Sequence, residues 1–513
     1  MSLGSQVGHR LAHQAIVAAL GWCSLRCMEP DRDLLGQRGD LAATLELAHA
    51  AASDYLARLV DGPVHEPGAG GDVELLGGPL PELGLGSLGA IRELIEHGLP
   101  SANRSSGPRM FHFVTGGVTP AALAADWLTS AIDQNAFSWV NSPLAARSES
   151  IAIDWLKDLF GLPAGWGGVL TTGATMANFT ALAAARHWWA GRHGVDVEAS
   201  GMTGLPAVPV LSSGAIHTSA VKALSMLGIG RSNVHRHAAD ATGRLDAAAL
   251  EAALDALDGA PAIIVANAGE VNTGAFDPIE LMADLAARYG AWLHVDGAFG
   301  LFARVSPLSA GLAAGIERAH SVIADGHKWL NVPYDCGFAF VRDPQYLSRA
   351  FAAGAAYLPP MDDPHPNFGY LGPDMSRRAR SLAVWATLAA YGRRGYRAMV
   401  ERHLALATRV AAGVDAAADL ERLAAVPLDI VCFRFRPAGM SEDELDELNT
   451  RLGRLLLDDG RVYVGTTLYD GHVAFRPAIV NWLTTEADVD LMVAVIRELG
   501  TSLVAGARSD PEG

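Results

Sequence analysis

Short apolar segments alternate with longer amphipathic segments between about residues 166 and 342 of this chain. Apolar runs such as "GGVLTTG", "AVPVLSSG" and "APAIIVANAG" are each followed by a stretch with apolar residues at helical spacing. "AWLHVDGAFG", "SVIADGHKWL" and "CGFAFVRD" continue the series of short apolar runs. Alternation of buried strands with helices predicts an α/β fold with a mostly parallel sheet that helices cover on both faces.

The flanking regions have other patterns. Residues 31–60 predict an amphipathic helix, and the Gly/Pro-rich residues 61–89 predict a linker. Helices are expected over residues 119–137 and 148–163, with starts at Thr119-Pro120 and Ser148, and over 376–414 with a break near Gly392 and Gly395. The tail, with a helix from Ser441, predicts a smaller α+β lobe. We therefore expect an N-terminal helical segment and linker (1–110), a large domain (111–395) and a small C-terminal domain (396–513).

Composition narrows the classes of partner. The formal net charge of −17 argues against nucleic acid, because no broad basic face can dominate the surface. No apolar run reaches transmembrane length, and the helical pattern of residues 11–22 lacks a signal-peptide cleavage site, so we expect no membrane partner and a cytoplasmic location. The cysteines show no CxxC pair and are expected to be free thiols: Cys23, Cys27, Cys336 and Cys432.

Chemically useful residues follow the expected strands. Ligands of open α/β sheets bind beyond the carboxyl ends of the strands. Gly173 in "TTGATMAN" lets the backbone approach a phosphate at a helix N-terminus, and His217 follows the next strand. Asp296 in "HVDGAFG" suits a protonated ring nitrogen, and Lys328 in "ADGHKW" suits an imine with an aldehyde.

Each of these residues also has an ordinary interpretation: a helix cap, a core histidine, a strand-end acid and a surface lysine. Their combination is more specific than any member. A phosphate loop, an acid for a pyridinium and an imine-forming lysine are the parts that pyridoxal phosphate needs. The sequence therefore predicts pyridoxal 5'-phosphate as the cofactor. No acid stands at metal spacing from the loop histidines His235 to His237, so we expect no metal.

Several stretches resemble, in the same order, those of the group II pyridoxal-phosphate-dependent amino-acid decarboxylases, the family of aromatic-L-amino-acid, histidine and glutamate decarboxylases. They are "FSWVNSP", "TTGATMAN", "AIHTSAVKA", "WLHVDGAFG", "ADGHKWLNVPYDCG", "SRRARSLAVW" and "AFRPAIVN". The resemblance extends from about Asp31 to Leu499. It implies fold type I of these enzymes, with a homodimer whose active sites lie at the subunit interface. The implied reaction is decarboxylation of an L-amino acid to an amine and CO2.

The resemblance also assigns roles to individual residues. Lys328 holds the cofactor as a Schiff base, Asp296 pairs with the pyridine nitrogen, His217 stacks on the ring, and Ala298 lies under its other face. It assigns the phosphate contacts to Gly173, Ala174 and Thr175, with help from Asp325 or His327. It assigns the substrate pocket to Phe113, Thr115, Phe137, Trp139 and Arg476. Its aromatic members favour an aromatic or apolar substrate.

One departure from the family bears on the reaction. Its decarboxylases protonate the carbanion with a tyrosine on a mobile loop. Counting back without gaps from "SRRARSL" places Phe368 there, whereas Tyr370 takes the position if the loop is aligned with a gap. We assign the role to Tyr370. Relatives with phenylalanine at this position carry out oxidative decarboxylation with deamination to an aldehyde, so that reaction stays open.

Other departures and alternatives remain. Glu270 and Val271 stand where better-known members carry two threonines, and only Glu149 is kept of two family acids. A carbon–carbon lyase of the same fold and a non-catalytic relative are further alternatives. A dinucleotide-binding oxidoreductase is disfavoured, because the "GLGSLG" of residues 84–89 follows no expected strand.

Overall fold

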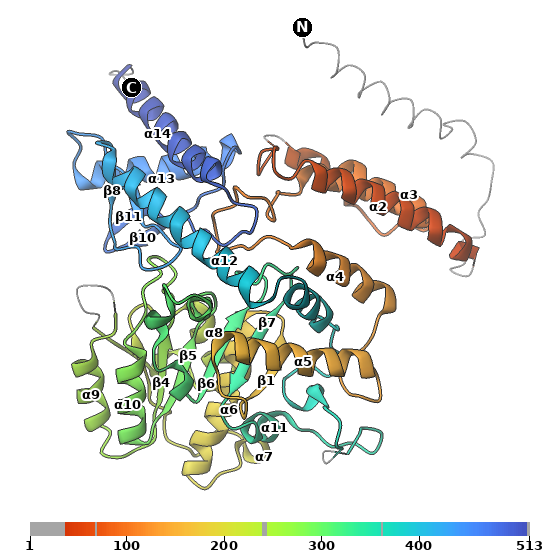
Figure 1. Cartoon of the computed structure of the whole chain (residues 1–513), viewed down its shortest axis with the longest axis vertical. Coiled ribbons are helices and arrows are strands. Elements are labelled where there is room, and N and C mark those ends of the chain that lie inside the picture. Colours follow the sequence, from red (N-terminus) through yellow and green to blue (C-terminus); the bar gives the residue numbers. More distant parts are fainter. Residues whose placement is uncertain (1–35, 67–68, 239–243, 361–362, 510–513) are drawn as a thin grey trace. The chain divides into compact units, whose positions relative to one another are not determined.

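A computed structural model describes residues 36–66, 69–238, 244–360 and 363–509 (Figure 1). The expected helix of residues 11–22, Cys23 and Cys27 lie outside the described residues. The chain divides into two compact units, one formed by residues 1–58 and 66–102 and the other by residues 59–65 and 103–513. Among the residues described, no helix is long and apolar enough to cross a membrane.

The first unit is helical. It contains η1 (Gly36–Asp40), α2 (Leu41–Ala57), η2 (Ala69–Leu76), α3 (Gly86–Glu93), η3 (Leu94–Gly98) and η4 (Leu99–Ser101). Helices α2 and α3 pack on each other, yet neither buries a single side chain fully. The "GLGSLG" sequence leads into α3, and no strand precedes it in the described part of this unit. It therefore lacks the strand that a dinucleotide fingerprint needs.

The second unit is built on a seven-stranded sheet of order β1-β7-β6-β5-β4-β2-β3. These strands are β1 (Gly167–Thr171), β2 (Val210–Ser213), β3 (Val234–His237), β4 (Ile263–Asn267), β5 (Trp292–Asp296), β6 (Ser321–Asp325) and β7 (Gly337–Val341). Only β7 runs antiparallel to its neighbours. Every residue of the central strands β4, β5 and β6 is buried, as expected for a sheet that is covered on both faces. The predicted mostly parallel sheet is confirmed.

The connections of this sheet are mainly helical. They comprise α6 (Ala174–Arg192), α7 (Val197–Ser200), α8 (Thr218–Met226), α9 (Ala247–Asp255) and α10 (Ile279–Tyr289), with the short helices η5 (Arg231–Asn233), η6 (Gly300–Val305), η7 (Ala310–Ala313) and η8 (Ile316–Arg318). Helices α11 (Gln345–Phe351) and η9 (Phe368–Tyr370) follow the last strand, β7. The prediction of a loop at His235 to His237 is wrong. These residues form β3, because they pair in parallel with β2 at the edge of the sheet.

A second, antiparallel sheet of order β10-β11-β9-β8 forms the predicted C-terminal α+β lobe. Its strands are β8 (Leu420–Arg422), β9 (Phe433–Phe435), β10 (Thr466–Tyr469) and β11 (His472–Phe475), accompanied by α13 (Glu442–Asp459) and α14 (Glu486–Ser509). Ser441 begins α13 as predicted, in a capping box with Glu444. The long helix α12 (Ser381–Ala416) is interrupted at Gly392, whose φ of 57° is not helical.

Two further helices, α4 (Pro120–Ile132) and α5 (Pro143–Phe160), pack on α12. Helix α4 starts at Thr119-Pro120 as predicted. The predicted start of α5 at Ser148 is wrong. The helix begins at Pro143, because the Ser142 hydroxyl accepts a hydrogen bond from the Ala145 amide and caps it, while Ser148 lies inside the helix.

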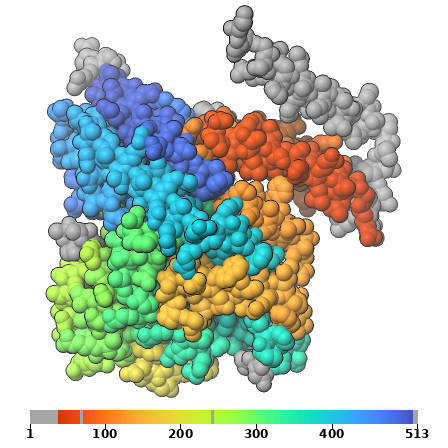
Figure 2. Space-filling view, in the orientation of Figure 1, coloured from red at the N-terminus to blue at the C-terminus, as the bar shows by residue number. Residues whose placement is uncertain are grey.

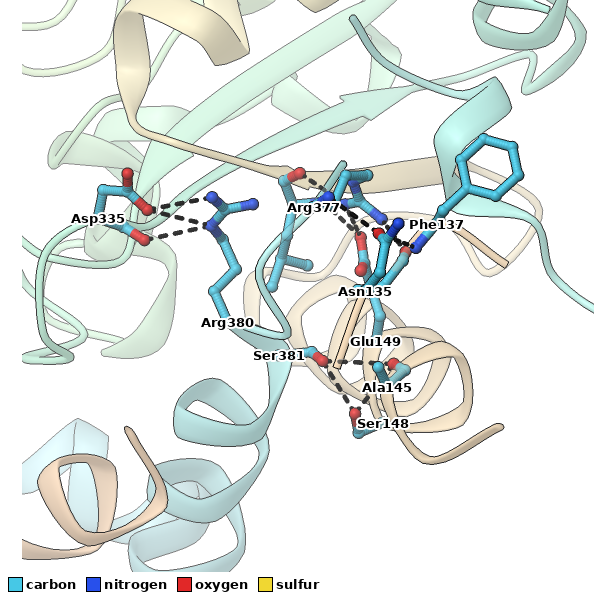
Figure 3. Close-up of polar contacts among 11 residues, drawn as sticks. Asn135, Phe137, Ala145, Ser148, Glu149, Asp335, Arg377, Arg380 and Ser381 are labelled. Atoms are coloured by element: carbon cyan, nitrogen blue, oxygen red, sulfur yellow. Dashed lines mark hydrogen bonds and ion pairs between the residues drawn. The ribbon is translucent and has the colours of Figure 1, made fainter. Parts of the chain in front are cut away.

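A buried ion pair connects several of these elements (Figure 3). The Arg377 guanidinium donates to Glu149 Oε1 at 2.6 Å and to the carbonyls of Leu170 and Ala136, each at 2.9 Å. Glu149 Oε1 also accepts the Leu170 amide, and both charged residues are buried. The pair thus joins the residues just before α12 to α5, to β1 and to residue 136. Hydrogen bonds to both partners compensate for the loss of their hydration.

We predict that replacing either partner alone, by Arg377→Met or Glu149→Gln, lowers the free energy of unfolding by about 3–5 kcal/mol, because one charge is left buried without its partner. Urea denaturation followed by tryptophan fluorescence measures this change. Arg378→Ala is the matched control, since Arg378 pairs with Asp126 at the surface and should cost at most about 1 kcal/mol. Equal effects of Arg377→Met and Arg378→Ala would contradict this account.

Candidate active site

The candidate site lies where the parallel strands end. Strands β1, β2, β4, β5 and β6 have the same direction, so their carboxyl ends lie at one edge of the sheet. Gly173 follows β1, His217 follows β2, Asp296 ends β5 and Lys328 follows β6. The topology therefore brings the four residues that the sequence singled out to a common edge.

Lys328 is held by the acid at the end of its own strand. Its Nζ lies 3.0 Å from Oδ2 of Asp325 and 6.0 Å from the centroid of the Phe299 ring. Only 16% of the lysine side chain is exposed. The other oxygen of the buried Asp325, Oδ1, has no hydrogen-bond partner in the described structure. The amine is thus desolvated and paired at the sheet edge, with a polar atom of its partner still unsatisfied.

The Asp296 carboxylate is buried and acts only as an acceptor. Oδ2 accepts a hydrogen bond from Nδ2 of Asn178 at 2.9 Å, and Oδ1 accepts one from the Ala298 amide at 3.2 Å. A buried carboxylate that only accepts hydrogen bonds fits a protonated ring nitrogen, and Ala298 lies beside the acid.

His217 caps α8 with its side chain. Nδ1 accepts the Ser219 amide at 3.2 Å and lies 2.6 Å from the Ser219 hydroxyl. Because an amide can only donate, Nδ1 carries no proton, and the neutral ring has its proton on Nε2. Burial lowers the pKa of His217 below its usual value, although the Asp296 carboxylate opposes the shift; Lys328 and Arg476 add to it. The ring is therefore a neutral Nε2–H donor at pH 7.

The start of α6 forms a cradle for an anion. Gly173 has a φ of 142°, and the first-turn amides that follow it have no partner within the helix. A Cβ atom on Gly173 would lie 3.1 Å from Cε1 of His327 and 3.5 Å from Oδ1 of Asp325. Ala174 and Thr175 occupy the first turn itself. This donor set fits a phosphate, so the residues at this edge together suit pyridoxal phosphate.

The segment of Phe113 and Thr115 lies against the lysine loop. The Gly116 amide donates to the His327 carbonyl at 3.2 Å, and a Cβ atom on Gly116 would collide with the Lys328 carbonyl. Phe113, with a φ of 58°, is 60% exposed, whereas Thr115 is buried. Phe113 thus exposes an aromatic ring on the segment whose Gly116 contacts the lysine loop.

Arg476 lies near His217. Its charge lowers the pKa values of both His217 and His112, and its Nη1 donates to the Val271 carbonyl at 3.2 Å. Glu270, although close enough to interact with Arg476, uses its carboxylate to accept hydrogen bonds from Asn272 and Thr273. The Glu270 carboxylate therefore stabilises the turn of residues 270–273. In the described part of the chain Arg476 makes no ion pair.

Three predicted residues form a separate aromatic group. Phe137 is buried and packs edge-on against Tyr370 at 5.4 Å, and Trp139 stacks on His365 at 4.6 Å. The Tyr370 hydroxyl donates to the Pro359 carbonyl at 2.6 Å. Phe368 is also buried, with the Arg377 guanidinium 5.7 Å from its ring centroid. Within the described residues no hydrogen bond, ion pair or ring contact joins this group to Lys328.

The structure adds residues that sequence analysis did not assign to the site. Buried Asn178 binds Asp296, and Asn331 accepts the Gly117 amide at 2.8 Å while donating to the Val480 carbonyl at 2.9 Å. His294 donates to Asn178 at 2.8 Å. A signal existed for His294, because a polar residue two positions before Asp296 lies on the same face of a strand. No local pattern indicates the contacts of Asn178 or Asn331.

Comparison with known proteins gives a consistent set of relatives. Residues 88–436 match the family described as "Pyridoxal-dependent decarboxylase conserved domain". An aromatic-L-amino-acid decarboxylase of Bacillus atrophaeus is 32% identical over 76% of this chain and 81% of its own. An L-2,4-diaminobutyrate decarboxylase of Rhizobium meliloti (strain 1021) is 34% identical over 83% and 84%, respectively. The crystal structure of Oryza sativa TDC with PLP and tryptamine superposes with a TM-score of 0.83, at 28% identity, and covers 91% of this chain and 98% of that one.

We predict that Gly173→Ala weakens the binding of pyridoxal phosphate roughly tenfold or more, because the new side chain strains a backbone with positive φ and narrows the cradle. Titration of the apo protein with cofactor, followed by fluorescence quenching, measures the dissociation constant. Gly191→Ala in the same helix is the control, since a Cβ there meets nothing within 4 Å. An unchanged affinity of Gly173→Ala would argue against a phosphate at the start of α6.

Proposed function

Because the chain belongs to the pyridoxal-dependent decarboxylase family, we propose that it decarboxylates an aromatic or apolar L-amino acid to the corresponding amine and CO2. The enzyme is a pyridoxal-phosphate-dependent carboxy-lyase of amino acids. The observation that carries the assignment of the site is the meeting of Lys328, Asp296, His217 and the start of α6 at one edge of the sheet. The proposal concerns the substrate and the roles of these residues.

The bound cofactor supplies an electron sink for the pair of electrons that the departing CO2 leaves at Cα. Lys328 would supply the amine that holds the cofactor's aldehyde. Asp296 would pair with the protonated ring nitrogen, and Ala298 and His217 would contact the ring. The α6 amides with Thr175 would bind the phosphate, beside Asp325 and His327. The residues that orient the substrate carboxylate would select the bond that breaks.

Arg476 is proposed to set that orientation by binding the substrate carboxylate. Its guanidinium is partly desolvated and makes no ion pair among the described residues, so a charge-assisted bond to a carboxylate is open to it. Phe113 offers an exposed aromatic surface near the lysine loop, which suits an aromatic side chain. Relatives named for aromatic substrates agree with this choice.

Cα must receive a proton in place of CO2, and Tyr370 is the proposed donor. In the described conformation its hydroxyl is committed to the Pro359 carbonyl. Tyr370 can therefore act only after the loop that carries it releases this contact, and His217 Nε2–H is the second donor within the site. If instead Phe368 takes the loop position, O2 and water are consumed. The products are then an aldehyde, CO2, ammonia and H2O2. Carbon–carbon lyase activity is the remaining alternative on this fold.

We predict that the cofactor-loaded enzyme releases CO2 from an aromatic L-amino acid without oxygen uptake. Recording CO2, O2 and H2O2 together over a panel of L-amino acids identifies both the substrate and the reaction. Lys328→Ala should abolish turnover, and Tyr370→Phe should lower amine formation while Phe368→Tyr should not. Stoichiometric O2 uptake with H2O2 would replace decarboxylation by aldehyde synthesis. Release of CO2 only from diaminobutyrate or acidic substrates would overturn the aromatic proposal.

We infer that two copies of the chain form a homodimer with active sites at the interface. Helices α4 and α5, which both pack on α12, and α12 itself expose large apolar side chains: Trp127, Leu128, Ile132, Leu144, Trp155, Trp385 and Tyr391, with Val140 between α4 and α5. The segments that contain α5 and α12 reach the surface of the molecule (Figure 2). Apolar surface of this kind marks protein interfaces. A partner seated there also gives a role to the Phe137, Trp139 and Tyr370 group, which makes no contact with Lys328 in its own subunit.

The N-terminal segment of residues 1–110 is proposed to interlock the two subunits. The rest of the chain is proposed to form a large domain of residues 111–395 and a small domain of residues 396–513. Helices α2 and α3 bury no side chain fully, and Leu41 and Leu45 on α2 are exposed, as are Leu80 and Leu83 in the loop before α3. Such a surface is unfavourable in water unless it is covered. A cytoplasmic location is proposed as well, in keeping with the free thiols of the buried Cys336 and Cys432.

We predict a sedimenting mass of twice 53.8 kDa for the wild-type chain. The double variant Leu128→Asp, Val140→Asp should shift toward the single-chain mass, because two charges replace exposed apolar side chains at the proposed interface. Leu281→Asp, at an exposed position on α10, which packs on α9, β4 and β5, is the control that should remain dimeric. A wild-type chain that sediments as a monomer would exclude the homodimer.

A further inference from the structure

A chain of buried hydrogen bonds runs from β5 and β6 to Asp296. Trp292 Nε1 lies 3.0 Å from the Ser321 hydroxyl, which lies 2.9 Å from Nδ1 of His294. His294 Nε2 lies 2.8 Å from Oδ1 of Asn178, and Asn178 Nδ2 lies 2.9 Å from Oδ2 of Asp296. All five residues are buried, and Trp292, His294, Asn178 and Ser321 are almost inaccessible to solvent.

Trp292 at one end and Asn178 at the other fix the direction of the bonds between them. An indole N–H can only donate, so the Ser321 oxygen accepts from Trp292, and His294 Nδ1 is the acceptor that the described contacts offer to the Ser321 proton. The proton of neutral His294 is then on Nε2 and is donated to Asn178 Oδ1. Burial lowers the pKa of His294 to about 4, so the ring is neutral at pH 7. Asn178 Nδ2 is left to donate to Asp296.

The opposite orientation of the Asn178 amide is excluded by the Ser219 hydroxyl. Nδ2 of Asn178 lies 3.3 Å from the Ser219 oxygen, whose one proton is directed to Nδ1 of His217. A flipped amide would place two oxygens there with no proton between them, and both would lose a hydrogen bond. Asn178 therefore presents an N–H donor to Oδ2 of Asp296 at 2.9 Å.

Asn178 also connects the acid to His217. Its Nδ2 lies 3.3 Å from the Ser219 oxygen, whose proton is directed to Nδ1 of His217 at 2.6 Å. One side chain on α6 thus contacts β5 and the first turn of α8, and it lies in the helix that begins at the phosphate cradle. Relative displacement of these three elements would break at least one bond of a buried amide.

We propose that Asn178 and His294 are positioning residues of this enzyme. They hold Asp296 as an acceptor for the protonated ring nitrogen and keep the His217 proton on Nε2. The inference rests on the proposed contact of Asp296 with the cofactor ring. Ser321 and Trp292 set the direction of the chain from its far end. Neither positioning residue needs to touch the substrate.

The test uses the full-length enzyme loaded with pyridoxal phosphate that carries 15N at the ring nitrogen. Asn178→Leu removes the donor to Asp296 and His294→Phe removes the donor to Asn178, while Thr180→Val is the control. Thr180 lies on the same helix, is fully buried, and its hydroxyl has no partner in the described structure. His294→Gln retains an N–H donor and serves as the conservative variant.

We predict that the ring nitrogen of wild type and Thr180→Val gives the 15N shift of a protonated pyridine. Asn178→Leu and His294→Phe should move it toward the unprotonated position and lower kcat roughly 10- to 100-fold, the usual cost of losing a group that orients a reactive residue. His294→Gln should restore part of the wild-type 15N shift and part of the wild-type kcat. Ser321→Ala, which removes one hydroxyl, should give a smaller shift in the same direction and provides a variant that is expected to fold.

The outcomes separate the inference from the function on which it rests. A wild-type 15N shift in Asp296→Asn would overturn the contact between Asp296 and the ring. A changed shift in Asp296→Asn with wild-type shifts and kcat in Asn178→Leu and His294→Phe would overturn the positioning role alone. If Asn178→Leu does not fold, the contrast between His294→Phe and His294→Gln decides: equal 15N shifts in the two variants would reject the proposal.

Discussion

The common direction of β1, β2, β4, β5 and β6 is the constraint on which the candidate site depends. Because these strands end at one edge, residues separated by more than 150 positions in sequence meet there without any special contact between them. The sheet alone, however, fixes the positions of the backbone segments and not those of the side chains. The hydrogen bond from Asn178 to Asp296 adds a side-chain contact that connects α6, which begins after Gly173, to the end of β5.

Three buried carboxylates in the described part of the chain are paired by directional contacts. Asp296 accepts from an amide side chain, Asp325 pairs with Lys328, and Glu149 pairs with Arg377 at 2.6 Å. Such groups cost free energy when unpaired, so each pairing restricts the geometry that the fold can adopt. Asp325 Oδ1 has no hydrogen-bond partner among the described residues and would lie 3.5 Å from a Cβ atom on Gly173.

Sequence patterns predicted the α/β class, the strand ends and the loop residues, because apolar runs and glycines report on backbone geometry directly. The capped start of α13 at Ser441 and the break at Gly392 were predicted for the same reason. Patterns failed where tertiary pairing decides: β3 exists only because β2 offers an edge, and Ser142 rather than Ser148 caps α5. The role of Asn178 was not predictable, since its partners on β5 and α8 come from distant segments. The contact between Tyr370 and Pro359 likewise depends on how the loop folds.

The central claim is that Lys328 carries the cofactor at this sheet edge. Reduction of the cofactor-loaded enzyme with borohydride, followed by proteolysis and mass spectrometry, locates the modified lysine directly. The account predicts a reduced pyridoxyl-phosphate group on the peptide that contains "ADGHKWLNVPYDCG", attached to Lys328 and absent from Lys157 and Lys222. Modification of another lysine, or of none, would contradict it.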